Sequence, residues 1–108
     1  MIDLVLQAIA EPRRREIMLL VQDKELSSGE IAAHFDVTRP AISQHLRVLA
    51  TAGLVIVRKR GTQRLYRARP EGFEELRSFI GGFWDEHLQL LKHEAEAEER
   101  RSRASDLT

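Results

Sequence analysis

Residues 38–49 carry arginine, serine, glutamine and threonine on one side of an expected helix and apolar residues on the other. A helix that only packs against a core does not need such a polar side. A helix in the major groove of DNA does, because glutamine can hold adenine and arginine can hold guanine through two hydrogen bonds, while serine reaches base edges or phosphate. The chemistry predicted here is base and phosphate recognition. The predicted contact residues are Thr38, Arg39, Pro40, Ser43, Gln44 and Arg47.

A strongly basic segment follows this helix. The chain has 17 basic and 17 acidic residues, yet residues 54–70 contain six bases and no acid, whereas residues 71–99 contain nine acids and two bases. A charge run is usually a solvated surface, and the charge alone leaves that alternative open. β-branched residues, a turn at 61–63 and alternation over 64–69 predict a β-hairpin whose basic tip suits phosphates or the minor groove. Its predicted contact residues are Arg58, Lys59, Arg60, Gln63 and Arg64.

Local signals place the recognition helix after a sharp turn. Ser27 and Glu30 have the spacing of a capping box, which begins a short helix. We expect Asp36 to adopt the left-handed conformation in the next turn, Thr38 to cap the recognition helix and Gly53 to end it. Helix, turn, helix and hairpin in this order are typical of a winged helix-turn-helix, so the expected fold is mainly α with a small β-hairpin.

Two more helices are expected at the ends of a single domain over residues 1–99. A short helix spans about residues 3–11 with Asp3 as its N-cap. A long amphipathic helix spans about residues 71–98, and residues 100–108 are expected to fray.

A run of three arginines and a pair of glycines are each unfavourable within the helices where they are expected to lie. Arg13–Arg15 lie in the first turn of a helix that begins at Pro12, which is the unfavourable end of the helix dipole for positive charge. We therefore expect nearby acids or an external anion to hold them. The Gly81-Gly82 pair weakens the last helix, so a kink or a close helix crossing is expected there.

The first and last helices carry more apolar surface than one small domain can cover. Four of the six aromatic residues lie in the last helix, and each can bury about 150–250 Å². We expect these helices to pair with a second copy, the alternative being a monomer whose last helix folds back. A two-fold dimer would hold two recognition helices about 34–36 Å apart and read an inverted repeat. The predicted interface residues are Val5, Ile9, Phe73, Leu76, Ile80, Phe83, Trp84 and Leu88.

Absent residue types exclude several classes of protein. The chain has no cysteine, P-loop or glycine-rich dinucleotide motif, so we expect neither an enzyme nor a cofactor. It shows no signal peptide and no apolar run near the ~20 residues of a membrane span, so a cytoplasmic protein without membrane contact is expected. Four residues on the last helix could bind metal across a dimer, but such residues are common on exposed acidic helices, and we predict no metal site. They are Asp85, His87, His93 and Glu96.

Four segments also carry a likeness to known proteins: Ala8–Ile17, Thr38–Leu49, Ala52–Val55 and Gly61–Tyr66. Together they resemble the ArsR (arsenical-resistance repressor) family of winged-helix regulators over nearly the whole chain. The resemblance implies a homodimeric transcriptional repressor that binds double-stranded DNA. Such a repressor could regulate its own operon. It also implies that Ser43, Gln44 and their neighbours read the major groove and that the first and last helices form the dimer.

Many members of the family that this chain resembles sense metals, but neither of the family's common sites has suitable residues here. The cysteine site would fall on residues 26–30, which hold no thiolate. The other site would fall near Arg69, Glu71, Gly82 and Asp85, where arginine and glycine cannot bind metal. The sequence therefore indicates a branch without the usual metal ligands, and it identifies no effector. The main alternative function is a winged helix that contacts another protein instead of DNA.

Overall fold

The structure is a computed structural model that describes the backbone of residues 2–106 and the side chains of residues 2–103. Its contacts divide the chain into a first unit that ends at Leu76 and a second that begins at Arg77. This division falls inside the single domain expected over residues 1–99.

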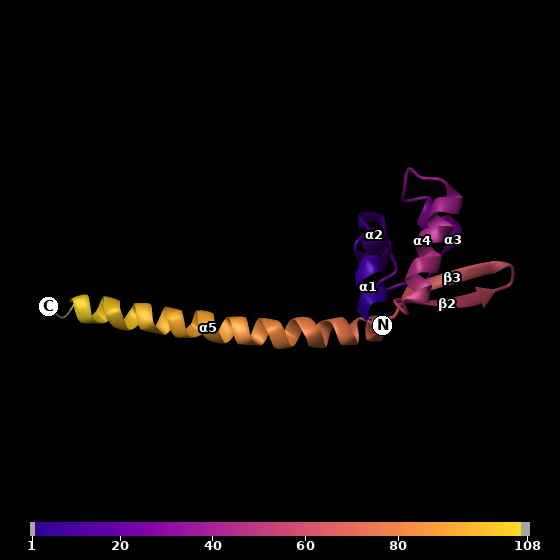
Figure 1. The fold of residues 1–108 in the computed structure, drawn as a ribbon. Coiled ribbons are helices and arrows are strands. Elements are labelled where there is room, and N and C mark those ends of the chain that lie inside the picture. The colour runs from indigo at the N-terminus through magenta and orange to yellow at the C-terminus, as the bar shows by residue number, and fades with distance from the viewer. Residues whose placement is uncertain (1, 107–108) are drawn as a thin grey trace. The chain divides into compact units, whose positions relative to one another are not determined.

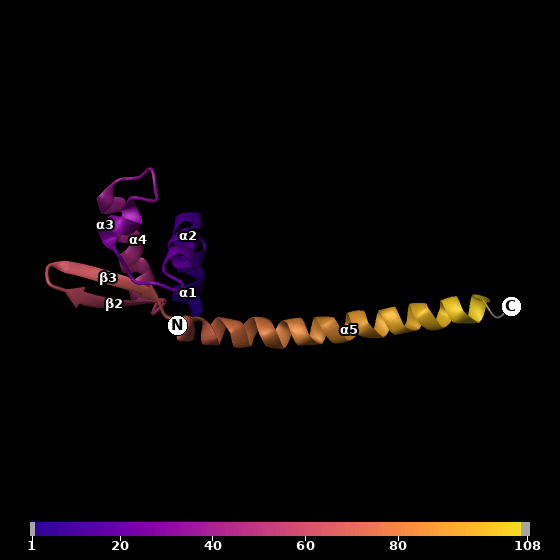
Figure 2. The ribbon, with the colours of Figure 1, turned by 180° about the vertical axis from the view of Figure 1, so that it is seen from behind.

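Four helices make up most of the first unit (Figures 1 and 2). They are α1 (Ile2–Ile9), α2 (Pro12–Leu20), α3 (Ser28–Ala32) and α4 (Arg39–Thr51). The capping box expected at Ser27 and Glu30 is confirmed, with both of its hydrogen bonds present. Thr38 caps α4, as expected, by accepting a hydrogen bond from the backbone of Ala41. Local sequence thus sets where both helices of the helix-turn-helix begin.

Two expectations about helix ends are wrong. Helix α1 covers Ile2–Ile9, so Asp3 lies in its first turn, where its charge favours the helix dipole, and does not cap it. Across the described residues only glycines have positive φ, at Gly53 and Gly61. Asp36 therefore turns the chain without the left-handed conformation, whereas Gly53 adopts it at the end of α4 as predicted.

Among the described residues, the preceding helix and not an acid holds the guanidinium groups of Arg14 and Arg15 at the start of α2. Arg14 Nε donates to the carbonyl oxygen of Ala8 at 2.7 Å, and Arg15 Nη1 donates to that of Ile9 at 2.6 Å. These carbonyls lie at the C-terminal end of α1, which is its negative end. The C-terminal end of α1 meets the N-terminal end of α2. The positive charge of these arginines, which is unfavourable for α2, therefore stabilises α1.

A three-stranded antiparallel sheet completes the first unit, with strand order β1-β3-β2. Its strands are β1 (Leu26–Ser27), β2 (Val55–Arg60) and β3 (Gln63–Ala68). The hairpin of β2 and β3 confirms the expected wing, although Gly61 and Thr62 alone form its turn. Strand β1 pairs with β3 through Leu26↔Tyr66 and Ser27↔Leu65. Two residues carry no readable alternation, so sequence patterning missed β1.

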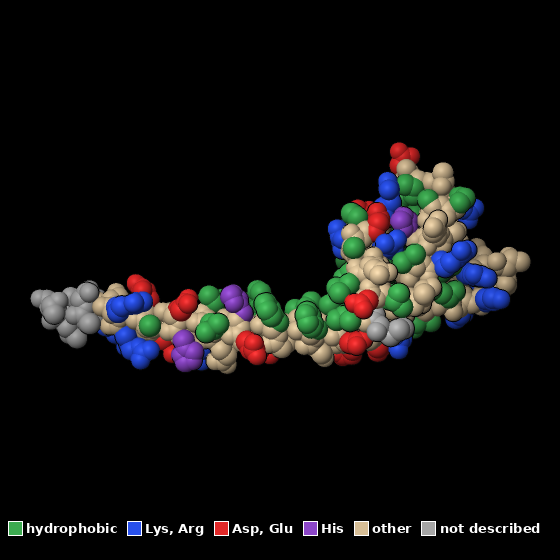
Figure 3. All heavy atoms as spheres, viewed as in Figure 1, with side chains coloured by type: hydrophobic (Ala, Val, Ile, Leu, Met, Phe, Trp, Pro, Cys, Tyr) green, Lys and Arg blue, Asp and Glu red, His purple; other side chains and the backbone are tan. Residues whose placement is uncertain are grey.

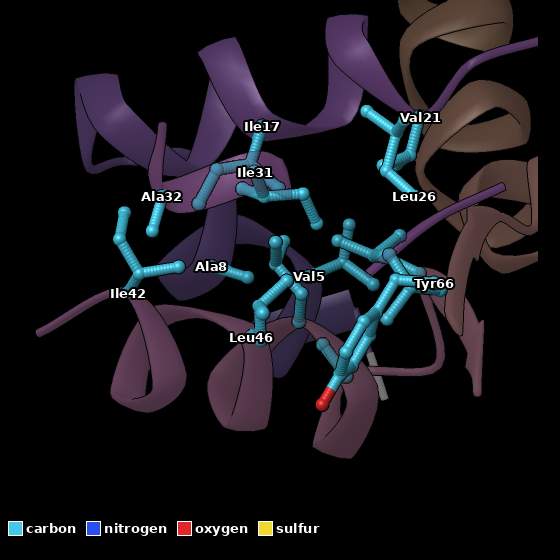
Figure 4. Packing of buried hydrophobic residues seen from close by; sticks show 14 of the residues in the cluster. Val5, Ala8, Ile17, Val21, Leu26, Ile31, Ala32, Ile42, Leu46 and Tyr66 are labelled. Carbon is cyan, nitrogen blue, oxygen red and sulfur yellow. The ribbon is translucent and has the colours of Figure 1, made fainter. Parts of the chain in front are cut away.

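The core lies between the helices and the sheet (Figure 4). Ile42, Leu46 and Leu49 of α4 are almost completely buried, together with Ile17 of α2 and Ile31 of α3. Tyr66 reaches the same cluster from β3. Helix α4 is thus fixed from three sides, and its polar side is left outward.

The last helix is longer than expected. A short 3₁₀ turn, η1 (Pro70–Phe73), leads into α5 (Glu74–Asp106). It continues past residue 98, and ion pairs such as Arg103–Glu99 bridge successive turns beyond that point. The rest of the expected frayed tail, residues 107–108, lies outside the described residues. Among those residues, no helix combines the length and apolar composition needed to cross a membrane.

Helix α5 continues without interruption through Gly81-Gly82. In the described part of the chain, a Cβ atom added to either glycine would meet nothing within 4 Å. Neither the kink nor the close crossing expected at this pair is present within the chain.

Gly72 in η1 should tolerate no side chain. A Cβ atom there would overlap the carbonyl oxygen of Gly53. Gly72→Ala is expected to lower the free energy of unfolding by about 1–3 kcal/mol. Gly81→Ala, the same change at an open helical position, should raise it by up to about 1 kcal/mol. Urea unfolding followed by circular dichroism measures both, and a Gly72→Ala protein as stable as wild type would contradict the packing described.

Candidate nucleic-acid interface

A polar cleft of about 580 Å³ opens between α4, the start of α3 and the hairpin. Arginines and hydroxyl groups dominate its lining, which makes it a site for a polyanion more than for an apolar ligand. These lining residues are Arg39, Arg47, Arg64, Ser28, Ser43 and Thr62.

All six predicted residues of the recognition helix are exposed. Arg39, Ser43 and Arg47 line the cleft, while Thr38, Pro40 and Gln44 belong to the same outward side of the helix or its cap. The Thr38 oxygen accepts the capping bond from Ala41 at 3.4 Å, which leaves its hydroxyl proton free for a phosphate.

The strand register divides the predicted wing residues between two sides of the hairpin. Lys59 lies opposite Arg64, on the side of Val57 and Tyr66 that faces the cleft. Arg58 lies opposite Leu65 and therefore on the other side, as do Arg60 and Arg67. Gln63 lies opposite Arg60 at the tip of the hairpin, where it borders the cleft beside Thr62. Figure 3 shows lysine and arginine side chains gathered over the hairpin.

One acid balances the basic hairpin, although none occurs within its sequence. Glu25, just before β1, receives two hydrogen bonds from Arg58, Nε to Oε2 at 2.9 Å and Nη2 to Oε1 at 2.8 Å. The Arg58 hydrogen bond lowers the pKa of the Glu25 carboxyl, and nearby Arg67 and Arg60 lower it further. The same pairing raises the pKa of Arg58. Arg58, which is predicted to contact DNA, is thus paired with an acid in the protein without DNA, because pairing β1 with β3 brings in a residue 33 positions away.

The predicted interface with a second copy divides by burial. Val5 is only 3% exposed and Leu76 only 8%, so both belong to the core of the chain and cannot cover a partner. Ile9 and Phe73 are partly buried against that core. Ile80, Phe83, Trp84 and Leu88 of α5 are exposed, Phe83 by 69%. Exposed apolar residues of α5 that the prediction omitted are Phe79, Leu90 and Leu91.

The four weak metal candidates are exposed along α5. In the described part of the chain, no three histidine, aspartate or glutamate residues gather closely enough to hold a metal ion. His87 lies near the Trp84 ring, with 5.9 Å between the ring centroids. Within one chain, Asp85, His87, His93 and Glu96 thus form no common site.

The fold, the outward polar side of α4 and the basic cleft define a winged helix-turn-helix protein that binds DNA. The comparisons with known proteins specify the family. Residues 11–57 match the sequence profile of the bacterial regulatory proteins of the arsR family. The HTH-type transcriptional regulator Rv2034 of Mycobacterium tuberculosis is 42% identical over 94 residues, which cover 83% of this chain and 88% of that protein.

Two further likenesses agree with this one. The transcriptional repressor SdpR of Bacillus subtilis is 37% identical over 57 residues, covering 53% of this chain and 63% of that protein. The solved ArsR-like transcriptional regulator from Rhodococcus sp. RHA1 is 33% identical with a TM-score of 0.68, covering 88% of this chain and 90% of that structure. The chain belongs to the ArsR family. It is a DNA-binding transcriptional regulator and not an enzyme.

Removing the Glu25 carboxylate should release Arg58 toward DNA. Glu25→Gln is expected to increase affinity for a scrambled duplex and to steepen the log–log salt dependence by about 0.9, the change for one added phosphate contact. Fluorescence anisotropy over a salt series measures both. Glu99→Gln is the matched control, because it removes the same charge from an exposed pair on α5. Equal effects of the two variants would mean that net charge, and not release of Arg58, is responsible.

Proposed function

We propose that this chain is a homodimeric repressor that binds an inverted-repeat operator and regulates its own operon. The observation that carries the proposal is the cleft in which the outward side of α4 meets the wing. In this arrangement α4 enters the major groove while the wing lies over the adjacent backbone or minor groove. These contacts need only side-chain donors and backbone N–H groups, without a metal or cofactor.

Each predicted contact has a role suited to its place. Gln44 and Arg47 would read base edges, with Ser43 able to reach bases or phosphate. Thr38 and Arg39 would hold a phosphate at the start of α4, where Pro40 shapes the first turn. Lys59, Gln63 and Arg64 would contact the backbone from the cleft side of the wing, and Arg58 and Arg60 from its other side.

Dimerisation is supported by the exposed apolar side of α5. Phe79, Ile80, Phe83 and Trp84 recur at helical spacing, and Leu88, Leu90 and Leu91 extend the stripe for two more turns. Such a surface on a polar, acidic helix is stabilised by a second copy. A two-fold pair would present two α4 helices to an inverted repeat.

Repression is proposed by analogy with the Bacillus subtilis relative, which is a repressor, although a relative of similar identity from Vibrio cholerae is an activator. The second candidate function, a winged helix for protein contact, does not require arginines at three points around one cleft, as Arg39, Arg47 and Arg64 are here. Equal, weak binding to all duplexes would favour that second candidate.

Two variants should distinguish residues that read bases from residues that contact phosphates. With a duplex selected by the protein from a random pool, Gln44→Ala is expected to lose about 1–3 kcal/mol of affinity and to leave binding to a scrambled duplex unchanged. Arg64→Gln should weaken binding to both duplexes and reduce the salt slope by about 0.9. Arg100→Gln on α5 is the charge-matched control. Anisotropy over a salt series measures these effects, and a duplex from upstream of the protein's own coding region tests autoregulation.

A charge in the α5 stripe should separate the two copies. Phe83→Glu is expected to sediment as a monomer, because dimerisation would bury an unpaired carboxylate. Gln89→Glu adds the same charge on the opposite side of α5 and should leave the dimer intact. Analytical ultracentrifugation decides between them, and a dimeric Phe83→Glu protein would place the interface elsewhere.

A further inference from the structure

Arg14 joins three helices through one side chain. Its Nε donates to the carbonyl oxygen of Ala8 at 2.7 Å and its Nη2 to that of Gln7 at 3.0 Å, both at the end of α1. Its Nη1 lies 3.3 Å from Nδ1 of His45 on α4. Arg14 belongs to the first turn of α2, so it links the end of α1 directly to the recognition helix.

This contact determines which nitrogen of His45 carries the proton. An arginine guanidinium is always charged and can only donate, so Nδ1 of His45 must accept. The proton of the neutral ring then lies on Nε2, which is 3.9 Å from Oε2 of Glu11. The His45 side chain, on α4, is 18% exposed.

The charged groups that face His45 both come from the start of α2. They are Arg14 at Nδ1 and Glu11 near Nε2. Glu11 also caps α2 by accepting a hydrogen bond from the Arg14 backbone, which fixes its position. At the end of α1, the backbone carbonyl oxygens of Gln7 and Ala8 accept hydrogen bonds from the Arg14 guanidinium and hold it in place.

We propose that the Arg14–His45 contact positions the recognition helix, and that operator recognition weakens when His45 takes up a proton. The proposal rests on the proposed function, because it concerns the same face of α4. Protonated His45 has a donor at both ring nitrogens, so Nδ1 would present an N–H and a positive charge to the Arg14 guanidinium. The hydrogen bond between Arg14 and His45 is then lost, so the polar contact of α4 moves from Arg14, which is fixed to α1, to Glu11 at the start of α2.

The effect falls on base reading more than on phosphate contact. His45 immediately follows Gln44, and the hydrogen bonds of Gln44 to a base depend strongly on distance and direction. Phosphate contacts by flexible arginine side chains tolerate a small shift of the helix. Protonation in general adds positive charge and strengthens binding to any duplex. Because this gain applies to both duplexes, it does not itself change the ratio of selected to scrambled affinity, and a fall in that ratio at acid pH reports a loss of base reading.

A preferred duplex is first selected from a random pool at pH 7.5. Fluorescence anisotropy then measures the affinity for this duplex and for its scrambled form between pH 7.5 and 5.5, the range in which imidazoles exchange their protons. For the wild type, the affinity ratio should fall about tenfold, the loss of one charge-assisted hydrogen bond. His45→Asn places an amide oxygen near the Nδ1 position and cannot be protonated, so it should keep the ratio at both pH values. Arg14→Met should show the low ratio at both. His34→Asn, which changes the exposed histidine in the turn that follows α3, should keep the wild-type profile.

Each result decides the proposal. A selected duplex whose ratio does not change with pH, or a His45→Asn protein with the wild-type pH profile, would overturn the role of His45. If His45→Asn fails to fold, the wild-type profile together with Arg14→Met decides the same question. If selection yields no preferred sequence at pH 7.5, the proposed function itself fails, which is distinct from a selected sequence read equally well at both pH values.

Discussion

Burial of one side of α4 is the constraint on which the rest of this structure depends. Ile42, Leu46 and Leu49 are almost fully removed from water, and burying each such side chain contributes about 1.5–3 kcal/mol. Rotating α4 about its axis would expose all three. The rotation of the helix is therefore determined, and Ser43, Gln44 and Arg47 are directed outward as a consequence. The proposed DNA contacts thus come from the side of α4 that packing leaves exposed.

The same core positions the wing, and the carboxylate of Glu25 reduces the wing's positive charge. Tyr66 anchors β3 among the core residues, and the antiparallel register then assigns each basic residue to one side of the hairpin. The cleft side carries Arg64 beside α4, while the far side carries Arg58 bound to Glu25. An exposed ion pair of this kind contributes little to stability. Its consequence is electrostatic, because it reduces the positive charge available to DNA.

Charge and helix ends connect the parts of the first unit. The arginines at the start of α2 are unfavourable for α2 itself, yet they satisfy carbonyl groups at the end of α1. Arg14 extends that arrangement to His45 on the recognition helix. In the second unit, α5 carries a stripe of exposed apolar residues around Phe83. One chain therefore contains a compact unit that holds α4 and the wing, and a helix with an exposed apolar stripe.

The sequence by itself determined the elements that depend on neighbours along the chain. The capping box at Ser27, the cap at Thr38, the glycine at the end of α4 and the alternating hairpin all follow from residues a few positions apart. The polar side of α4 also follows from the sequence, since helical periodicity alone separates it from the buried side. Contacts between distant residues were decided only by the tertiary structure: strand β1, the Glu25–Arg58 pair, the burial of Val5 and the link from Arg14 to His45. Their partners lie far apart in sequence or meet across separate elements, and no local pattern records which side chains the packing of a core brings together.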